Sequence, residues 1–255
     1  MNPVEFGHAV LISRVAAGQW HALEDDLVAG RAETSRRPDG RTFVSVDAWH
    51  DATFDRLAEA MLAALPRPLY TVVDEADLEL TARWQRAGFA VRRREWEYAV
   101  PTDPRVTGLD SAPPPGVMIL PVGAAEEAPL RALDRQIRAE VEAGPGWADM
   151  PAEVLARPQL DPAKYAVAAL SGRYVGLLRV AMVTRQPRIG LVAVRAEHQR
   201  RGIGRALLAH TLGALHRIGK DTAAAEVTES NVAATALFDG IGARRAGSNL
   251  ELILR

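Results

Sequence analysis

The chain has 255 residues, of which 48% are hydrophobic, enough apolar material for one large domain or two of ordinary size. Its 31 basic and 32 acidic side chains leave a net charge of −1, which provides no overall field for nucleic acid or an acidic membrane. The absence of cysteine excludes disulfides, thiolate zinc sites and a cysteine nucleophile, and without a basic leader or a long apolar stretch the chain is expected to be cytoplasmic.

The first half of the chain alternates strand and helix patterns. Residues 41–49 and 69–74 predict strands, and residues 51–66 predict an amphipathic helix between them. Residues 78–89 predict a second helix that ends at Gly88, since glycine accepts the left-handed conformation that closes many helices. The first helix is expected to bury Phe54, Leu57, Met61, Leu62 and Leu65.

A proline-rich stretch divides the sequence. Five prolines fall within residues 101–116, where they disfavour both a helix and a central strand. We therefore expect a linker at 101–115 between a first domain, 1–100, and a second domain, 116–255.

The second half repeats the order of the first. Residues 188–196 predict a strand, a helix follows from Gly204, and a further strand and helix are predicted at 223–230 and 232–243. Two unrelated α/β segments remain the alternative to a true repeat. The matching pairs are Gly30 with Gly176 and Val46 with Val192, each 146 positions apart, and Asp77 with Asn231, Trp84 with Phe238 and Gly88 with Gly242, each 154 apart.

Residues 199–205, QRRGIGR, form a basic, glycine-containing loop between the predicted strand and helix. The first N–H groups of a helix are unpaired and its dipole favours an anion, so this loop predicts a phosphate site. A Walker loop is absent, and Leu207 stands where a dinucleotide fingerprint needs a third small residue. Nucleic-acid binding is disfavoured, because the basic cluster is short and no aromatic platform accompanies it.

The spacing Gln199-x-x-Gly202-x-Gly204 resembles the coenzyme A pyrophosphate loop of the GNAT superfamily of N-acetyltransferases, and the likeness extends over residues 120–255. It implies an α/β (α+β) fold of two GNAT-like units, each a mixed, twisted central sheet flanked by helices. In the first half the corresponding turn, residues 47–57, has three aspartates and no glycine. An acidic turn repels pyrophosphate, so the first copy is expected to be degenerate and to lack cofactor.

The resemblance also implies which residues bind acetyl-CoA. The pantetheine arm would lie along the strand at 192–194, and the pyrophosphate would meet the loop. Asn231 is expected either to bond the pantetheine or to cap the last helix. The family often has a tyrosine as general acid where this chain has Phe238. The implied cofactor residues are Val192, Ala193, Val194, Gln199, Arg200, Arg201, Gly202, Ile203, Gly204, Arg205, Asn231 and Phe238.

The remaining site residues concern the acceptor amine. Glu226 in AEVTESN resembles the glutamate of ribosomal-protein N-terminal acetyltransferases and is expected to be the general base. Ser230, Thr228 or water would protonate the leaving thiolate, or the thiolate would leave unassisted. The acceptor is expected to meet Glu142, Trp147 and Asp149, with Glu140 as a further candidate, and the histidines show no metal spacing.

These features together predict an acetyl-CoA-dependent N-acetyltransferase in which the amine attacks directly within a ternary complex. The acceptor would be a small-molecule amine or a peptide N-terminus, with no metal, nucleic acid or membrane partner, and the protein would be a monomer or homodimer. A non-catalytic acyl-CoA-binding or sensing module is the alternative, since Phe238 has no proton to give.

Overall fold

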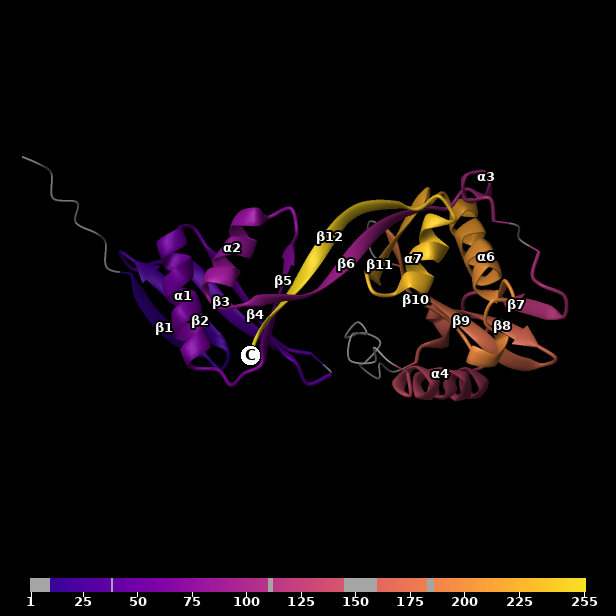
Figure 1. The fold of residues 1–255 in the computed structure, drawn as a ribbon, viewed down its shortest axis with the longest axis horizontal. Coiled ribbons are helices and arrows are strands. Elements are labelled where there is room, and N and C mark those ends of the chain that lie inside the picture. Colours follow the sequence, from indigo (N-terminus) through magenta and orange to yellow (C-terminus); the bar gives the residue numbers. More distant parts are fainter. Residues whose placement is uncertain (1–9, 38, 110–111, 145–159, 183–185) are drawn as a thin grey trace, which may run out of the picture. The chain divides into compact units, whose positions relative to one another are not determined.

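The computed structural model describes residues 10–37, 39–109, 112–144, 160–182 and 186–255 (Figure 1). The chain divides into two compact units. Unit 1 takes the chain up to Arg94 together with residues 249–255, and unit 2 takes residues 95–248. No helix within the described ranges is long and apolar enough to cross a membrane.

Unit 1 is a mixed sheet with two helices. Its ladder runs β1-β2-β3-β4-β5-β12, antiparallel except between β4 and β5, which pair in parallel over two residues each. Its elements are β1 (Leu11–Ala16), β2 (Gln19–Glu24), β3 (Leu27–Arg36), β4 (Thr42–Ala48), α1 (Asp51–Ala63), β5 (Leu69–Asp74), α2 (Leu78–Arg86) and the start of β6 (Ala90–Pro101).

Helix α1 forms the centre of the unit 1 core. Phe54, Leu57 and Met61 are buried one helical turn apart, as their spacing predicts, and Trp84 of α2 packs edge-on against Phe54 with ring centroids 5.1 Å apart. Gly88 has a φ of +96° just beyond α2, which confirms the predicted left-handed helix end.

Unit 2 is also a mixed sheet, in the order β6-β11-β10-β9-β8-β7. Figure 1 shows α4 on one side of this sheet and α6 on the other. Its elements are α3 (Pro104–Thr107), β7 (Val117–Leu120), α4 (Glu127–Glu142), a 3-10 turn (Pro162–Lys164), β8 (Tyr165–Leu170), β9 (Arg173–Met182), β10 (Pro187–Val194), a second 3-10 turn (Ala196–His198), α6 (Ile203–Arg217), β11 (Thr222–Thr228), α7 (Val232–Asp239) and β12 (Arg244–Leu254).

Two separate cores cover the faces of the unit 2 sheet. On one face α6 buries Leu207, Leu208, Leu212 and Leu215 against alternate residues of β11, including Ala225. On the other face α4 packs Leu130, Leu133 and Ile137 against the sheet. Side chains of one strand therefore point alternately to the α6 face and the α4 face.

The two units share an element order but exchange their final strands. From β4 onward unit 1 reads strand, helix, strand, helix, strand, and unit 2 reads the same from β10. Strand β6, which ends the first copy, pairs with β11 of unit 2, whereas β12, which ends the second copy, pairs with β5 of unit 1. Each sheet is thus completed by a strand from the other half of the sequence.

This exchange makes unit 1 depend on the C-terminus. Leu252 is fully buried in the unit 1 core, so L252A is expected to lower the free energy of unfolding by about 2–5 kcal/mol through lost burial and a cavity. Hydrogen exchange should show lost protection in β5, its partner strand. I253A, on the opposite and half-buried side of β12, should cost less. Equal effects of the two substitutions, or unchanged exchange in β5, would contradict this account of the exchanged strand.

The boundary predicted from proline content differs from the observed one. The chain passes into unit 2 after Arg94, within β6, and residues 249–255 return to unit 1. The expectation that the prolines prevent any helix in the linker was wrong, since Pro104 begins the one-turn helix α3. Proline is tolerated there because the first N–H of a helix needs no intrahelical partner.

Candidate active site

The glycine loop of unit 2 leads into the N-terminus of α6. Gly202 is the N-cap residue, with a left-handed φ of +81°, and the first bond of the helix joins the Ala206 N–H to the Gly202 carbonyl. The N–H groups of Ile203, Gly204 and Arg205 precede that bond, so they have no partner within the helix. These unpaired N–H groups lie where the sequence predicts an anion site, and the dipole of the helix favours an anion there.

The structure gives different reasons for glycine at the two positions of the loop. Gly202 suits its left-handed backbone, which other residues adopt only at a cost. Gly204 has an ordinary helical backbone, and a Cβ added to it would meet Val192 at an unstrained 3.9 Å. Packing therefore does not require glycine at 204. A ligand lying close against the helix N-terminus does give a reason for it.

Strands β10 and β11 separate next to this loop. Their parallel ladder contains only the pairs Arg188 with Ala224 and Ile189 with Ala225. The register of β10 against β9 shifts between Ile189 and Leu191, which places a bulge at Gly190. Beyond the bulge, residues 191–194 remain bonded to β9 but leave the β11 ladder, so this edge of β10 is open to an added extended chain.

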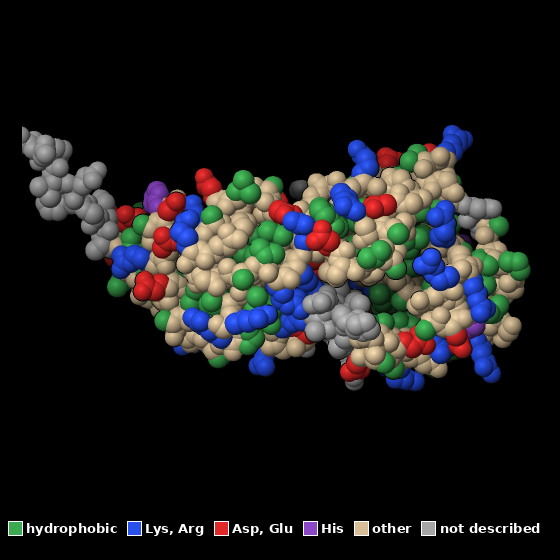
Figure 2. Space-filling view, viewed as in Figure 1, with side chains coloured by type: hydrophobic (Ala, Val, Ile, Leu, Met, Phe, Trp, Pro, Cys, Tyr) green, Lys and Arg blue, Asp and Glu red, His purple; other side chains and the backbone are tan. Residues whose placement is uncertain are grey.

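A cavity of about 1190 Å³ occupies the space between the separated strands, the loop and helices α4 and α7. Figure 2 shows hydrophobic side chains in a recess of unit 2. All the predicted cofactor residues except Arg201 line the cavity, as do Glu226 and Ser230. The size suits a cofactor-sized ligand.

Glu226 lies on the α4 face of β11, because its neighbours Ala225 and Val227 belong to the α6-side core. Its carboxylate accepts a hydrogen bond of 2.5 Å from the Arg188 guanidinium of β10. Glu226 pairs across the ladder with Glu97 of β6, the strand that the first half of the chain provides. The candidate base is thus oriented by an arginine and lies beside a second carboxylate.

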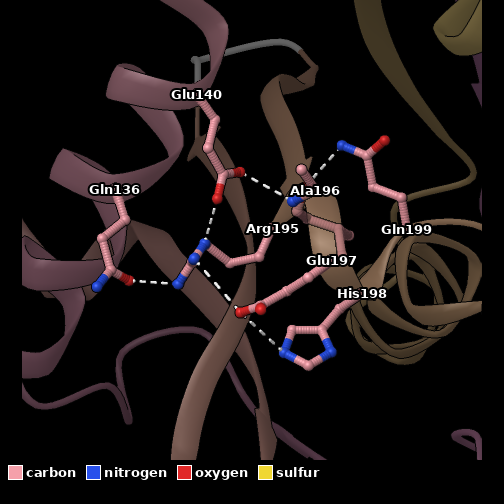
Figure 3. A network of polar contacts seen from close by, with 8 residues as sticks. Gln136, Glu140, Arg195, Ala196, Glu197, His198 and Gln199 are labelled. Atoms are coloured by element: carbon pink, nitrogen blue, oxygen red, sulfur yellow. Dashed lines mark hydrogen bonds and ion pairs between the residues drawn. The ribbon is translucent and has the colours of Figure 1, made fainter.

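A polar network holds the loop against α4 (Figure 3). Glu140 of α4 accepts one hydrogen bond from Arg195 Nε at 2.5 Å and another from the Ala196 N–H at 2.8 Å. Arg195 also donates to the Gln136 side-chain oxygen at 2.7 Å. Glu140, expected as a possible partner of the acceptor, is therefore engaged with the loop, although it also lines the cavity.

The pKa of Glu140 gives this network a testable pH dependence. Burial alone raises the pKa, but the hydrogen bond from Ala196 and the guanidinium of Arg195 outweigh it and hold the pKa below its ordinary 4.5. A carboxyl with a lowered pKa stabilises the fold above its unfolded pKa, and this contribution is lost as the pH falls through the folded value.

We therefore expect E140Q to lower the free energy of unfolding by about 1–2 kcal/mol at pH 7. The difference from the wild type should begin to shrink as the pH falls below 4.5 and should be lost only below the lowered folded pKa, where the wild-type side chain is neutral as well. E142Q, which changes an exposed glutamate two residues along the same helix, is the matched control. Denaturation of both variants over a series of pH values from neutral into strong acid measures the difference, and a pH-independent difference for E140Q would contradict the ionised contact.

Helix α7 closes the other side of the cavity. Asn231 is its N-cap, and its side-chain oxygen accepts a hydrogen bond from the Ala234 N–H at 3.1 Å, which is one of the two predicted roles. Phe238 is buried and stacks on Tyr98 of β6 with centroids 5.5 Å apart. Tyr98 donates its hydroxyl hydrogen to Asp239, and burial is the main cause that raises its pKa.

The predicted acceptor residues are only partly described. Glu142 is exposed and does not line the cavity, while Trp147 and Asp149 lie outside the described residues. Thr228 lines the cavity, is 8% exposed, and its hydroxyl has no hydrogen-bond partner in the described chain. It is a better placed hydroxyl than the exposed Ser230.

Three features of the site were not predicted: the bulge at Gly190, the Arg188–Glu226 ion pair and the Arg195–Glu140 contact. Only the bulge had a sequence signal, since an isolated glycine within an apolar strand is typical of one. The ion pairs join residues 38 and 55 positions apart, which local patterns do not specify. Among the described residues no group of three or more acidic or histidine side chains is arranged to hold a metal.

Comparison with known families bears on this geometry. Residues 134–243 match the sequence model of the acetyltransferase (GNAT) family. This segment is a GNAT domain. It contains β10, the glycine loop, α6, β11 and α7, the elements that enclose the cavity. The predicted membership of the GNAT superfamily is thereby confirmed.

The GNAT domain also resembles a curated enzyme over a short segment. It is 44% identical over 55 residues to the [ribosomal protein bS18]-alanine N-acetyltransferase of Escherichia coli K12. The match covers 22% of this chain and 37% of that protein.

Solved structures extend the likeness to both units. A GCN5-related N-acetyltransferase from Sphaerobacter thermophilus superposes with a TM-score of 0.63 at 18% identity, covering 95% of this chain and 82% of that one. A tandem GNAT protein from the clavulanic acid biosynthesis pathway gives 0.66 at 15% identity, covering 92% and 82%. At these identities the comparison shows the fold, and the predicted fold of two GNAT-like units, each a mixed sheet with flanking helices, is confirmed.

Proposed function

We propose that this chain transfers an acetyl group from acetyl-CoA to a primary amine by direct attack within a ternary complex. The observation that carries the proposal is the single cavity where the free N–H groups of α6, the open edge of β10 and the carboxylate of Glu226 meet. The GNAT family match over the same elements supports it.

The donor would be held by backbone rather than by side-chain charge. The N–H groups of residues 203–205 would bind the pyrophosphate, with Arg200 and Arg205 supplying countercharge. The open edge of residues 192–194 would pair with the pantetheine arm as an added strand, and a backbone N–H there would stabilise the oxyanion that forms at the thioester carbonyl.

Glu226 would act as the general base. Arg188 orients its carboxylate, which would take a proton from the acceptor as the carbon–nitrogen bond forms. Phe238 has no proton for the departing thiolate, so the hydroxyl of Thr228 would donate a hydrogen bond to the sulfur. Full protonation is not required, because a thiol of ordinary pKa leaves as the thiolate.

Unit 1 would have no donor site of its own. Its α1 begins at Asp51, whose carboxylate pairs with Arg83 at the position that corresponds to the glycine loop. A negative side chain at a helix N-terminus competes with a phosphate for the same N–H groups. Strand β4 also lacks the bulge of β10, since its register against β3 is continuous. The first half of the sequence would contribute to the site only through residues 95–101 of β6, which belong to unit 2.

Phe238 is buried and has no proton to give to the leaving thiolate. This favours a second candidate function, a module that binds acyl-CoA without turnover. The test is to incubate the full chain with acetyl-CoA and a panel of amines and to follow free thiol. Amine-dependent thiol release supports the transferase. Binding of acetyl-CoA with no release for any amine would favour the binding module.

A further inference from the structure

Arg179 of β9 differs from three other arginines near the cavity. Arg138, Arg188 and Arg195 each form an ion pair with a carboxylate, at distances of 2.5 to 2.8 Å. Arg179 is half-buried, and no hydrogen bond or ion pair joins it to any residue that the structure describes. Its guanidinium nitrogens are not buried, so this cation is open to an acceptor that a ligand brings.

The Arg179 guanidinium lies next to Gly190, a residue of the cavity wall, although Arg179 is not itself one of the lining residues. A Cβ added to Gly190 would stand 2.9 Å from Nη1 of Arg179, and Gly190 lines the cavity. Any side chain at the bulge would therefore push the guanidinium away. The bulge and its glycine allow an arginine of the neighbouring strand to reach over β10.

Arg179 and Glu226 share one face of the sheet. Arg179 pairs across the ladders with Tyr165 and Leu191, both of which pack in the α4-side core. Glu226 points to that same side, as its neighbours in the α6-side core require. Strands β9, β10 and β11 follow one another in the sheet, so the two side chains stand on the same face with one strand between them.

The charged side chains on this face differ in sign between the two sides of the sheet. Glu226 and Glu97 lie on its β11–β6 side, where Arg188 of β10 pairs with Glu226, and Arg179 lies on its β9 side beyond Gly190. An ammonium group is attracted to the first side and a carboxylate to the second. Both side chains are long enough to converge over Gly190 on a ligand of a few bonds' length.

We propose that Arg179 binds a carboxylate of the acceptor while Glu226 faces its amine, so that the acceptor is a small amino acid. This inference rests on the proposed acetyl transfer at the same cavity. Arginine suits the role because its planar guanidinium binds a carboxylate through two parallel hydrogen bonds. The class comprises amines with a carboxylate a few bonds away, such as α-amino acids and short ω-amino acids.

The test compares acceptors in pairs. Free amino acids, including β-alanine and γ-aminobutyrate, are assayed beside their carboxamides with the wild type, R179A and R179K. For the wild type we expect the acids to be preferred over the amides. For R179A, kcat/KM for the acids should fall about 10- to 100-fold, the loss expected of a charge-assisted pair, with changes below about threefold for the amides. R179K should be intermediate.

For each acceptor, kcat/KM of the variant is divided by kcat/KM of the wild type. This ratio cancels the difference in amine pKa between an acid and its carboxamide. R173A is the matched control, since Arg173 is an exposed arginine at the start of the same strand and does not lie next to Gly190 as Arg179 does. It should leave all rates unchanged, and calorimetry should show the same acetyl-CoA affinity for every variant. Amides used as well as acids by the wild type, or equal losses for both in R179A, would overturn the inference.

Failure of the proposed acetyl transfer can be distinguished from failure of the carboxylate site. If the wild type binds acetyl-CoA but acetylates no amine, the transferase proposal fails, and the amino acids themselves are titrated by calorimetry. Binding that R179A abolishes would still support the carboxylate site. No binding to the wild type would overturn it.

Discussion

G202D is expected to raise the Kd for acetyl-CoA about 10²- to 10³-fold while the protein remains folded. The substitution places a carboxylate at the N-cap of α6, within reach of the N–H groups proposed to bind the pyrophosphate. Two like charges about 4 Å apart near a protein surface repel by roughly 4 kcal/mol, which accounts for the loss. Calorimetric titration with acetyl-CoA measures it, and circular dichroism checks the fold.

G202N is the control that isolates charge from backbone strain. Gly202 has a φ of +81°, and asparagine and aspartate tolerate that left-handed region better than other side chains. The two variants therefore carry similar strain and similar size, and both favour a helix N-cap. G202N should lose far less affinity than G202D. Equal losses would mean that shape rather than charge matters at 202, and an unchanged Kd in folded G202D would place the anion elsewhere.

E226Q is expected to lower turnover at neutral pH about 10²- to 10⁴-fold, the usual contribution of a general base. Glutamine keeps the size of the side chain and an oxygen that can accept the hydrogen bond from Arg188, but it does not take a proton at this pH. The affinity for acetyl-CoA should hardly change, because the proposed donor contacts come from β10 and the loop.

A rise in pH should partly restore E226Q. At high pH a larger fraction of the acceptor is already neutral and needs no base, whereas a variant damaged in packing gains nothing from this change. E229Q is the comparison, since Glu229 lies three residues along the chain and does not line the cavity. A wild-type rate with an unshifted pH profile in E226Q would remove Glu226 from the mechanism, and a loss in E229Q would indicate its replacement.

Local patterns predicted much of the fold. The repeat pairs Asp77 with Asn231 and Gly88 with Gly242, and the structure gives each pair one role. Both polar residues cap a helix through a side-chain oxygen, and both glycines have positive φ just beyond that helix. Such signals were readable because capping depends on a few neighbouring residues.

The exchange of β6 and β12 was not predicted. Either strand could complete either sheet by its alternating pattern, and the choice depends on packing between distant segments. Glu251 illustrates this: it is 2% exposed and accepts charged contacts from Arg92 at 2.6 Å and Arg93 at 2.9 Å. The burial of this glutamate is explained only by the arginines of β6, which the sequence alone does not place beside it.

The candidate site was also predicted only where it depends on a local sequence pattern. The loop at 199–205 and the strand before it were found because a helix N-terminus with glycines has a sequence signature. The acceptor side stays a prediction: Glu142 is exposed, Glu140 holds the loop, and Trp147 and Asp149 lie outside the described residues. The acceptor residues that we propose come from β9 and β11, and no spacing in the sequence links these strands.

Calorimetric titration of the full chain with acetyl-CoA tests the central claim most directly. The asymmetry between the units, with a glycine loop before α6 and Asp51 at the start of α1, predicts one binding site per chain, with its affinity lowered about 10²- to 10³-fold in the G202D variant. Two equivalent sites, or full binding in a folded G202D protein, would contradict the account.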